Sequence, residues 1–293
     1  MRRGRVVLIF GVVAFAVAVA LWGLGKTIDP VSAALTRSEN AGGANFALTV
    51  TATPPSGQPV TVKASGVFDG QSADVTTDLS GALAALGQSG ANGQIEIRYL
   101  QENGDPVIYA NAPALSAMIP GGATWVRLDL ETLGKSFGVD LNQLLGQGAQ
   151  NPTDALDLLK AVGSVQAVTT DPIPGTTHYV AQIDPSKVAG QIATDIGGPI
   201  GQKIQSAVAN APATPAPIPV DVWIDDSGLV RQVVLDLSGT RDGQTGSLHL
   251  QLDITDYGTA VNVTAPPSSD VFDATGLVSS FASNASSLVP STH

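Results

Sequence analysis

The stretch VWIDDSGLVRQVVLDLSGT, residues Val222–Thr240, predicts two β-strands joined by a tight turn. Its second half alternates between two sets of side chains: Leu229, Val233, Leu235 and Leu237 on one face, and Val230, Gln232, Val234 and Asp236 on the other. This alternation is typical of a sheet with one buried and one solvated face. Asp226-Ser227-Gly228 supplies the turn, because glycine adopts positive φ without a steric cost. The apolar face contacts either an ordinary core or an apolar ligand, and the pattern alone leaves both open.

The same alternation recurs along the chain and predicts about eleven strands. They are expected at residues 46–51, 60–63, 73–78, 95–100, 106–110, 125–130, 165–170, 178–183, 220–225, 229–238 and 248–254. Helices are expected at residues 28–40, 112–119, 130–145, 151–162 and, in two pieces, 184–208. Consecutive antiparallel strands with few helices favour an α+β fold. A wide sheet curls through its own twist, so we expect a strongly curved antiparallel sheet, a half-barrel, with helices packed inside the bend.

The N-terminus predicts export. Three arginines, Arg2, Arg3 and Arg5, precede Val6–Leu24, which is nineteen residues without a charge. As a helix this run spans about 28 Å, close to the hydrocarbon thickness of a bilayer. The arginines place its N-terminal end in the cytoplasm and the rest of the chain on the extracytoplasmic side of the cell membrane. The segment is either a retained transmembrane signal anchor or a signal peptide cleaved after Ala20, which would give a secreted protein.

Charge and cysteine content exclude several classes of function. Four of the 14 basic residues precede the first acidic one, Asp29, so the remainder carries ten basic and 25 acidic residues. Such an acidic body repels phosphate backbones, and we expect no nucleic-acid binding. The absence of cysteine excludes disulfides, thiolate metal sites and lipid attachment to cysteine.

The sequence contains no pattern that predicts chemistry. Of the three histidines, His178 and His249 fall on expected strands and His293 ends the chain, without a second ligand at metal-binding spacing. The glycine-rich segment at Gly197 has the wrong spacing for a phosphate loop. We therefore predict no enzyme activity and no catalytic, cofactor-binding or metal-binding residues.

An ordered set of segments resembles the mycobacterial LppX/LprG lipoprotein family, whose members have a LolA-like fold. The set comprises Pro219–Asp225 with Gly228–Arg231, Trp125–Leu128 after the turn at Pro120–Gly122, the expected helix Ala155–Ala161 leading to Val165, His178–Pro185, and Tyr257-Gly258 followed by Val261–Val263 and Ala265–Pro267. The resemblance spans about residues 30–272.

This resemblance implies a bent antiparallel sheet with helices inside the bend, enclosing a hydrophobic cavity. It implies an actinobacterial cell-envelope protein that binds or transports acylated lipids or glycolipids, without a cofactor. The family is tethered by a lipidated cysteine, which this chain lacks. A retained N-terminal helix would replace that anchor and restrain any shuttling.

These expectations give a domain plan and a candidate lipid site. Residues 1–26 form the signal anchor or signal peptide, 27–40 a connecting helix, 41–272 the LolA-like lipid-binding domain, and 273–293 a Ser-rich tail. The expected cavity lining is Leu156, Leu159, Val233, Leu235, Leu237, Leu250 and Leu252. An anchored envelope sensor or interaction module, with the same fold and no lipid cargo, is the alternative function.

Overall fold

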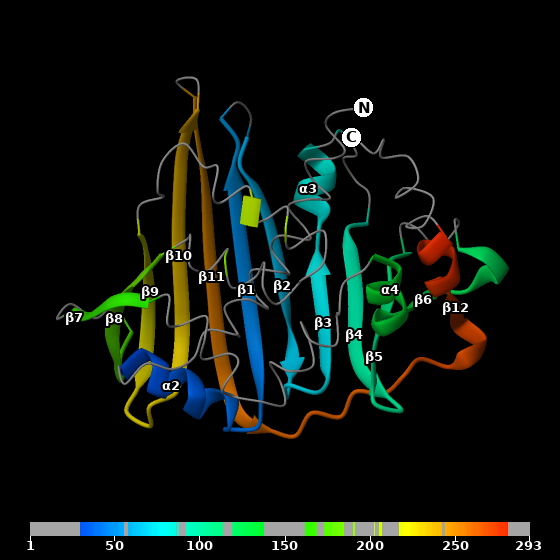
Figure 1. Cartoon of the computed structure of the whole chain (residues 1–293), viewed down its shortest axis with the longest axis horizontal. Helices are drawn as coiled ribbons and strands as arrows, with labels where there is room; N and C mark the ends of the chain where they lie inside the picture. Colours follow the sequence, from blue (N-terminus) through cyan, green and yellow to red (C-terminus); the bar gives the residue numbers. More distant parts are fainter. Residues whose placement is uncertain are drawn as a thin grey trace.

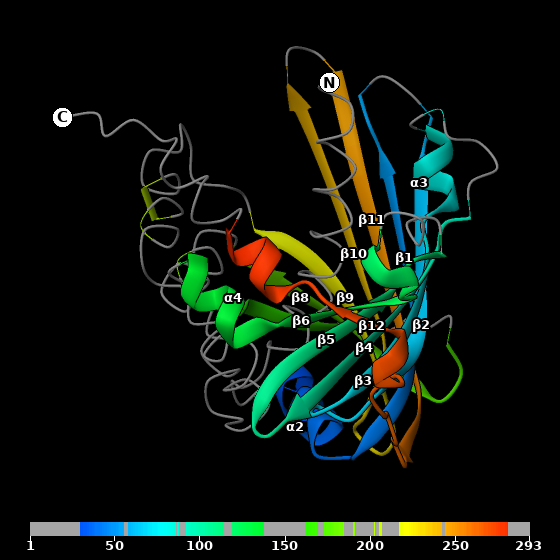
Figure 2. The same ribbon diagram turned by 90° about the vertical axis from the view of Figure 1, so that its right-hand side faces the viewer.

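One large open sheet organises the protein. The computed structural model describes residues 30–280 except 56–57, 86, 88–91, 114–118, 138–161, 169–172, 185–189, 191–201, 203–204, 207–216 and 242–243. Within these residues twelve strands form a sheet in the order β12-β6-β5-β4-β3-β2-β1-β11-β10-β9-β8-β7. Every neighbouring pair is antiparallel except β12 and β6. The sheet twists and bends strongly, as its side view shows (Figure 2).

The strands follow the two-residue alternation of the sequence. Their bounds are β1 Gly43–Thr53, β2 Val60–Phe68, β3 Ala73–Asp78, β4 Gln94–Glu102, β5 Asp105–Asn111, β6 Trp125–Asp129, β7 Val162–Val168, β8 Thr176–Ile183, β9 Ile218–Asp225, β10 Val230–Arg241, β11 Gln244–Thr259 and β12 Val271–Asp273. All eleven expected strands are present, and β12 is an addition.

Short helices accompany the sheet. They are α2 Pro30–Glu39, α3 Ser80–Ala85 and α4 Leu130–Phe137, with 3-10 turns η2 Pro120–Gly122 and η3 Ser268–Asp270, and a helical segment at 275–280. Asp129 begins α4 by accepting the backbone N–H of Thr132 at 2.8 Å. In both views α2 and α4 lie on the same side of the sheet (Figures 1 and 2).

The predicted fold class, a curved antiparallel sheet with few helices, is confirmed. The helices expected near residues 28–40 and 130–145 are present as α2 and α4, and residues 138–145 of the second lie outside the described residues. Val162, expected at a helix end, instead begins β7. Most of the helix expected at 184–208, the N-terminal apolar segment and the final residues 281–293 lie outside the described residues. No helix in the described part of the chain is long and apolar enough to cross a membrane.

The two faces of the sheet differ sharply in chemistry. We call the face that bears Leu48, Leu250 and Val233 the apolar face, and the opposite one, with Arg98 and Arg127, the charged face. An irregularity in the β9–β10 pairing between Val230 and Gln232 shifts the alternation by one residue. Val230, expected on the solvated face, therefore pairs with Ile224 and is buried at 1% exposure.

The chain after β11 joins the sheet's centre to its far edge. It runs along one end of the sheet (orange in Figure 1) and adds β12 parallel to β6. On the charged face its Val263 packs against the buried cluster that includes Val107 and Trp125, and its Thr264 carbonyl accepts a hydrogen bond from Arg98 at 3.1 Å. Ala274 and Thr275 beyond β12 are buried. The sheet-bound chain therefore continues past residue 272, where we had expected the tail to begin.

Candidate functional site: the apolar face of the sheet

The candidate site is the apolar face of β1–β6. Directly paired residues of antiparallel strands share a face, so the register fixes its membership. The face carries Ala44, Phe46, Leu48, Val50 and Ala52 of β1; Val60, Val62, Ala64, Gly66 and Phe68 of β2; Ala73, Val75 and Thr77 of β3; Ile95, Ile97, Tyr99 and Gln101 of β4; Pro106, Ile108 and Ala110 of β5; and Val126 and Leu128 of β6. None of these positions in β1–β6 holds a charged residue.

The same apolar face continues onto β11, β10 and β9, and the helix α2 covers one end of it there. Its Val31 and Ala34 are 3% and 2% exposed and belong to the core cluster that includes Ile224 and Ile254. Two polar contacts hold the helix there: Arg37 donates to the Ser227 carbonyl at 2.8 Å, and Ser38 Oγ accepts the Val230 N–H at 2.9 Å. Beside them, Tyr257 Oη of β11 donates to the Val230 carbonyl at 2.6 Å. The core under α2 is therefore packed and fixed in place.

Away from α2, Val75 and Pro106 are buried, but many other apolar side chains of the same face are only half-buried. On β10 and β11 these are Leu235, Leu237 and Leu248; on β4–β6 they are Ile95, Ile97, Ile108, Val126 and Leu128. Half-buried aliphatic side chains gathered on one face leave apolar surface available to a ligand. The face thus divides into a packed part under α2 and a less covered part that reaches β6.

The expected lining residues fall in both parts. Leu250, Val233 and Leu252 are 0%, 6% and 6% exposed and belong to the packed core. Leu235 and Leu237 lie on the same face and are half-buried. Leu156 and Leu159 lie outside the described residues. The less covered residues of β4–β6 were absent from the expected lining, although the alternation Ile95, Ile97, Tyr99 already signalled one apolar face there.

One polar pair stands at the edge of the apolar face. Gln101 Nε2 donates to Tyr99 Oη at 2.9 Å, near the turn that joins β4 to β5. Gln101 is exposed and Tyr99 is half-buried. Burial raises the pKa of Tyr99, and the hydrogen bond from Gln101 opposes this in part. The phenol therefore stays protonated at neutral pH.

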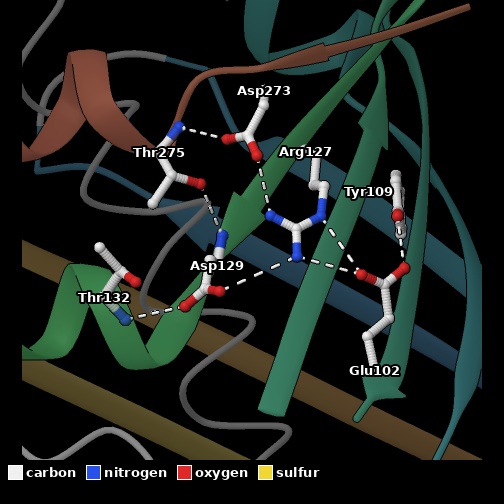
Figure 3. Close-up of polar contacts among 7 residues, drawn as sticks. All are labelled: Glu102, Tyr109, Arg127, Asp129, Thr132, Asp273 and Thr275. Atoms are coloured by element: carbon white, nitrogen blue, oxygen red, sulfur yellow. Dashed lines mark hydrogen bonds and ion pairs between the residues drawn. The ribbon is translucent and has the colours of Figure 1, made fainter. Parts of the chain in front are cut away.

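The charged face of β4–β6 combines ion pairs with a buried apolar cluster of Leu100, Val107, Tyr109 and Trp125. Arg127 lies at its centre, 3.0 Å from Glu102 Oε2, 2.9 Å from Asp273 Oδ2 and 3.8 Å from Asp129 Oδ2 (Figure 3). Tyr109 Oη donates to Glu102 at 2.5 Å, and burial raises the pKa of Tyr109, which the Glu102 carboxylate raises further. These contacts tie β4, β5, β6 and β12 together.

Two histidines on this face have carboxylate partners that the sequence did not reveal. His178 Nε2 lies 2.7 Å from Asp221 Oδ1 and its ring stacks on Trp223 at 4.3 Å between centroids. His249 Nδ1 lies 2.8 Å from Asp236 Oδ1. Each partner sits on an adjacent strand, so only the strand register brings it close. Among the described residues, no three His, Cys, Asp or Glu side chains are grouped so that they could hold a metal.

Comparisons with known proteins give one family assignment. No protein-family model matches the chain, so membership of the LppX/LprG family stays a prediction. A LolA superfamily protein from Nitrosomonas europaea superposes with a TM-score of 0.26 at 9% identity, over 82% of this chain and 96% of its own. A DUF1329 family protein from Desulfovibrio piger gives a TM-score of 0.26 at 10% identity, over 80% and 93%.

A sequence relative is more informative. The uncharacterized 31.2 kDa protein encoded in the rplA–rplJ intergenic region of Streptomyces griseus is 30% identical over 260 residues, which cover 84% of this chain and 79% of the relative. Because this similarity extends over most of both chains, the protein belongs to the same family as that Streptomyces griseus protein.

Proposed function

We propose that the protein is a cell-envelope lipid-binding protein that holds or transfers acylated lipids or glycolipids against the apolar face. The observation that carries the proposal is the half-buried, charge-free apolar surface of β4–β6 beside the packed core. Each methylene that leaves water contributes about 0.8 kcal/mol, so an acyl chain has ample driving force to cover this surface. The resemblance to the LppX/LprG lipoproteins supports the same function.

We further propose that the domain lies on the extracytoplasmic side, tethered by the uncharged segment Val6–Leu24. In place of a lipidated cysteine, that segment would keep the domain at the membrane in which its ligands reside. Fractionation and the intact mass of the mature chain test the tether. Recovery of a soluble protein that begins at Leu21 would contradict it.

Lipid content of the purified protein tests the main proposal. The full chain, produced in a Streptomyces host and extracted from membranes, should carry an acylated lipid by native mass spectrometry and organic extraction. Ile97→Trp places a bulky ring on the less covered part of the apolar face. We expect it to lower the amount of bound lipid severalfold while thermal unfolding stays near that of the parent protein.

Thr76→Trp is the matched control, because Thr76 is exposed on the charged face of the adjacent strand β3. It should leave the bound lipid unchanged. A parent protein without lipid, or equal lipid in the Ile97→Trp and Thr76→Trp variants, would overturn the proposal. The sensor or interaction module would then be the better account of the fold.

A further inference from the structure

The charge distribution restricts which part of a lipid the apolar face accepts. On β2–β6 its polar side chains are Thr77, Tyr99 and Gln101, and none is charged. The nearby strand arginines point to the opposite face, where Arg98 pairs with Glu96 at 2.7 Å and Arg127 with Asp273 at 2.9 Å. On the helices, Lys135 pairs with Glu131 and Arg37 donates to Ser227. Among the described residues, no cation faces this surface, so a carboxylate or phosphate buried against it would lack a partner within that part of the chain, which is costly.

Polarity changes in order along β4. From the β4–β5 turn inward, the apolar face presents exposed Gln101, then half-buried Tyr99, then half-buried Ile97 and Ile95. An acylated lipid has the same order, with a polar end and an apolar chain. Its chain would lie over the isoleucines and its polar end beside the Tyr99–Gln101 pair.

The pair has hydrogen-bonding capacity left for a ligand. Tyr99 Oη accepts a hydrogen bond from Gln101, and no described residue accepts one from the Tyr99 hydroxyl. That hydroxyl hydrogen can therefore be donated to a ligand. The Gln101 amide adds a carbonyl acceptor and a second N–H donor. Uncharged donors and acceptors suit an ester carbonyl or a hydroxyl.

We propose that Tyr99 and Gln101 form the polar end of the lipid site and select a neutral group, an acyl ester or a hydroxyl, over an anionic headgroup. This rests on the lipid-binding function proposed above. The geometry that supports it is the 2.9 Å hydrogen bond at the boundary between exposed and half-buried positions of β4.

A competition experiment tests the selection. Delipidated full-length protein is mixed with equimolar dipalmitoylglycerol and dipalmitoylphosphatidylglycerol, which share their chains and differ in headgroup charge. Native mass spectrometry measures the occupancy of each lipid. We expect the parent protein to favour the diacylglycerol at least fivefold, and Tyr99→Phe, which removes only the hydroxyl, to lower that occupancy about five- to tenfold.

Tyr179→Phe is the matched control. Tyr179 lies on the apolar face of β8, where it packs against the core that includes α2. Loss of its hydroxyl should leave the occupancies unchanged. An unchanged preference in Tyr99→Phe, or a parent preference for phosphatidylglycerol, would overturn this inference and leave lipid binding intact. A parent protein that binds neither lipid would overturn the proposed function as well.

Discussion

At the residue scale, one turn joins the sheet to α2. Asp225 accepts the backbone N–H groups of Ser227 and Leu229, both at 2.9 Å. Gly228 adopts φ 76°, which side chains with a Cβ rarely adopt. A Cβ there would lie 2.5 Å from Arg37 Nη1, the atom that donates to Ser227. The turn predicted from Asp226-Ser227-Gly228 is thus also the docking point of the helix.

We predict that Gly228→Ala lowers the free energy of unfolding by about 2 kcal/mol, from backbone strain and from the displaced Arg37 contact. Gly104→Ala is the control, because Gly104 also has positive φ, at 96°, but a Cβ there would meet no atom of the described residues within 4 Å. Urea denaturation should show the smaller loss for Gly104→Ala. When Arg37→Ala is also present, Gly228→Ala and Gly104→Ala should lower the free energy of unfolding by equal amounts. A difference that persists would show that the Arg37 contact does not account for the larger effect at Gly228.

At the element scale, β12 depends on contacts from distant parts of the chain. The strand has three residues, yet Asp273 pairs with Arg127 at 2.9 Å, and Thr275 Oγ1 accepts the Asp129 N–H at 2.9 Å. Short strands gain little from their own ladder, so these side chains must contribute much of its stability.

We expect Arg127→Met to release β12 from β6. The change leaves the Glu102, Asp129 and Asp273 carboxylates facing each other without a cation, and should cost about 1–3 kcal/mol. Hydrogen exchange should quicken over residues 268–280 and stay slow in β1, β10 and β11. Lys135→Met, which removes an exposed cation, is the control. Equal exchange in both variants would show that β12 is held by other contacts.

The elements show which features the sequence could predict. Alternation located β3 at Ala73–Asp78 with the same bounds as the structure, because a sheet solvated on one face imposes that period. It could not predict β12, a three-residue strand that pairs with the distant β6, or the face of Val230, which an irregular pairing reverses. The alternation in the sequence predicts that Tyr99 and Gln101 share one face. Their position at the edge of that face follows only from the strand register in the structure. The His178–Asp221 pair likewise depends on the β8–β9 register.

At the scale of the whole molecule, the sheet separates the charged residues of an acidic chain from its apolar face. The formal net charge is −11, yet the described strands β1–β6 keep every charged residue off the apolar face. Several carboxylates are then held by directed hydrogen bonds on the other face. Burial alone would raise the pKa of Asp225, but bonds from Leu229, Arg231 and Ser227 outweigh it and lower the pKa below 3.8.

This lowered pKa gives the last prediction, a loss of stability in acid. Because the folded pKa of Asp225 is below its unfolded value, its stabilisation is full above about pH 5 and is lost as pH falls through the folded pKa. Bonds from Thr275 and the Arg127 ion pair lower the pKa of Asp273 in the same way, against the effect of burial. Urea denaturation between pH 3 and 6 should therefore show falling stability below about pH 4.

In Asp225→Asn the fall should be shallower, since one titrating group is removed, whereas Asp226→Asn, an exposed neighbour, should follow the parent curve. If the free energy of unfolding falls equally with pH in the parent, Asp225→Asn and Asp226→Asn proteins, Asp225 does not couple folding to pH.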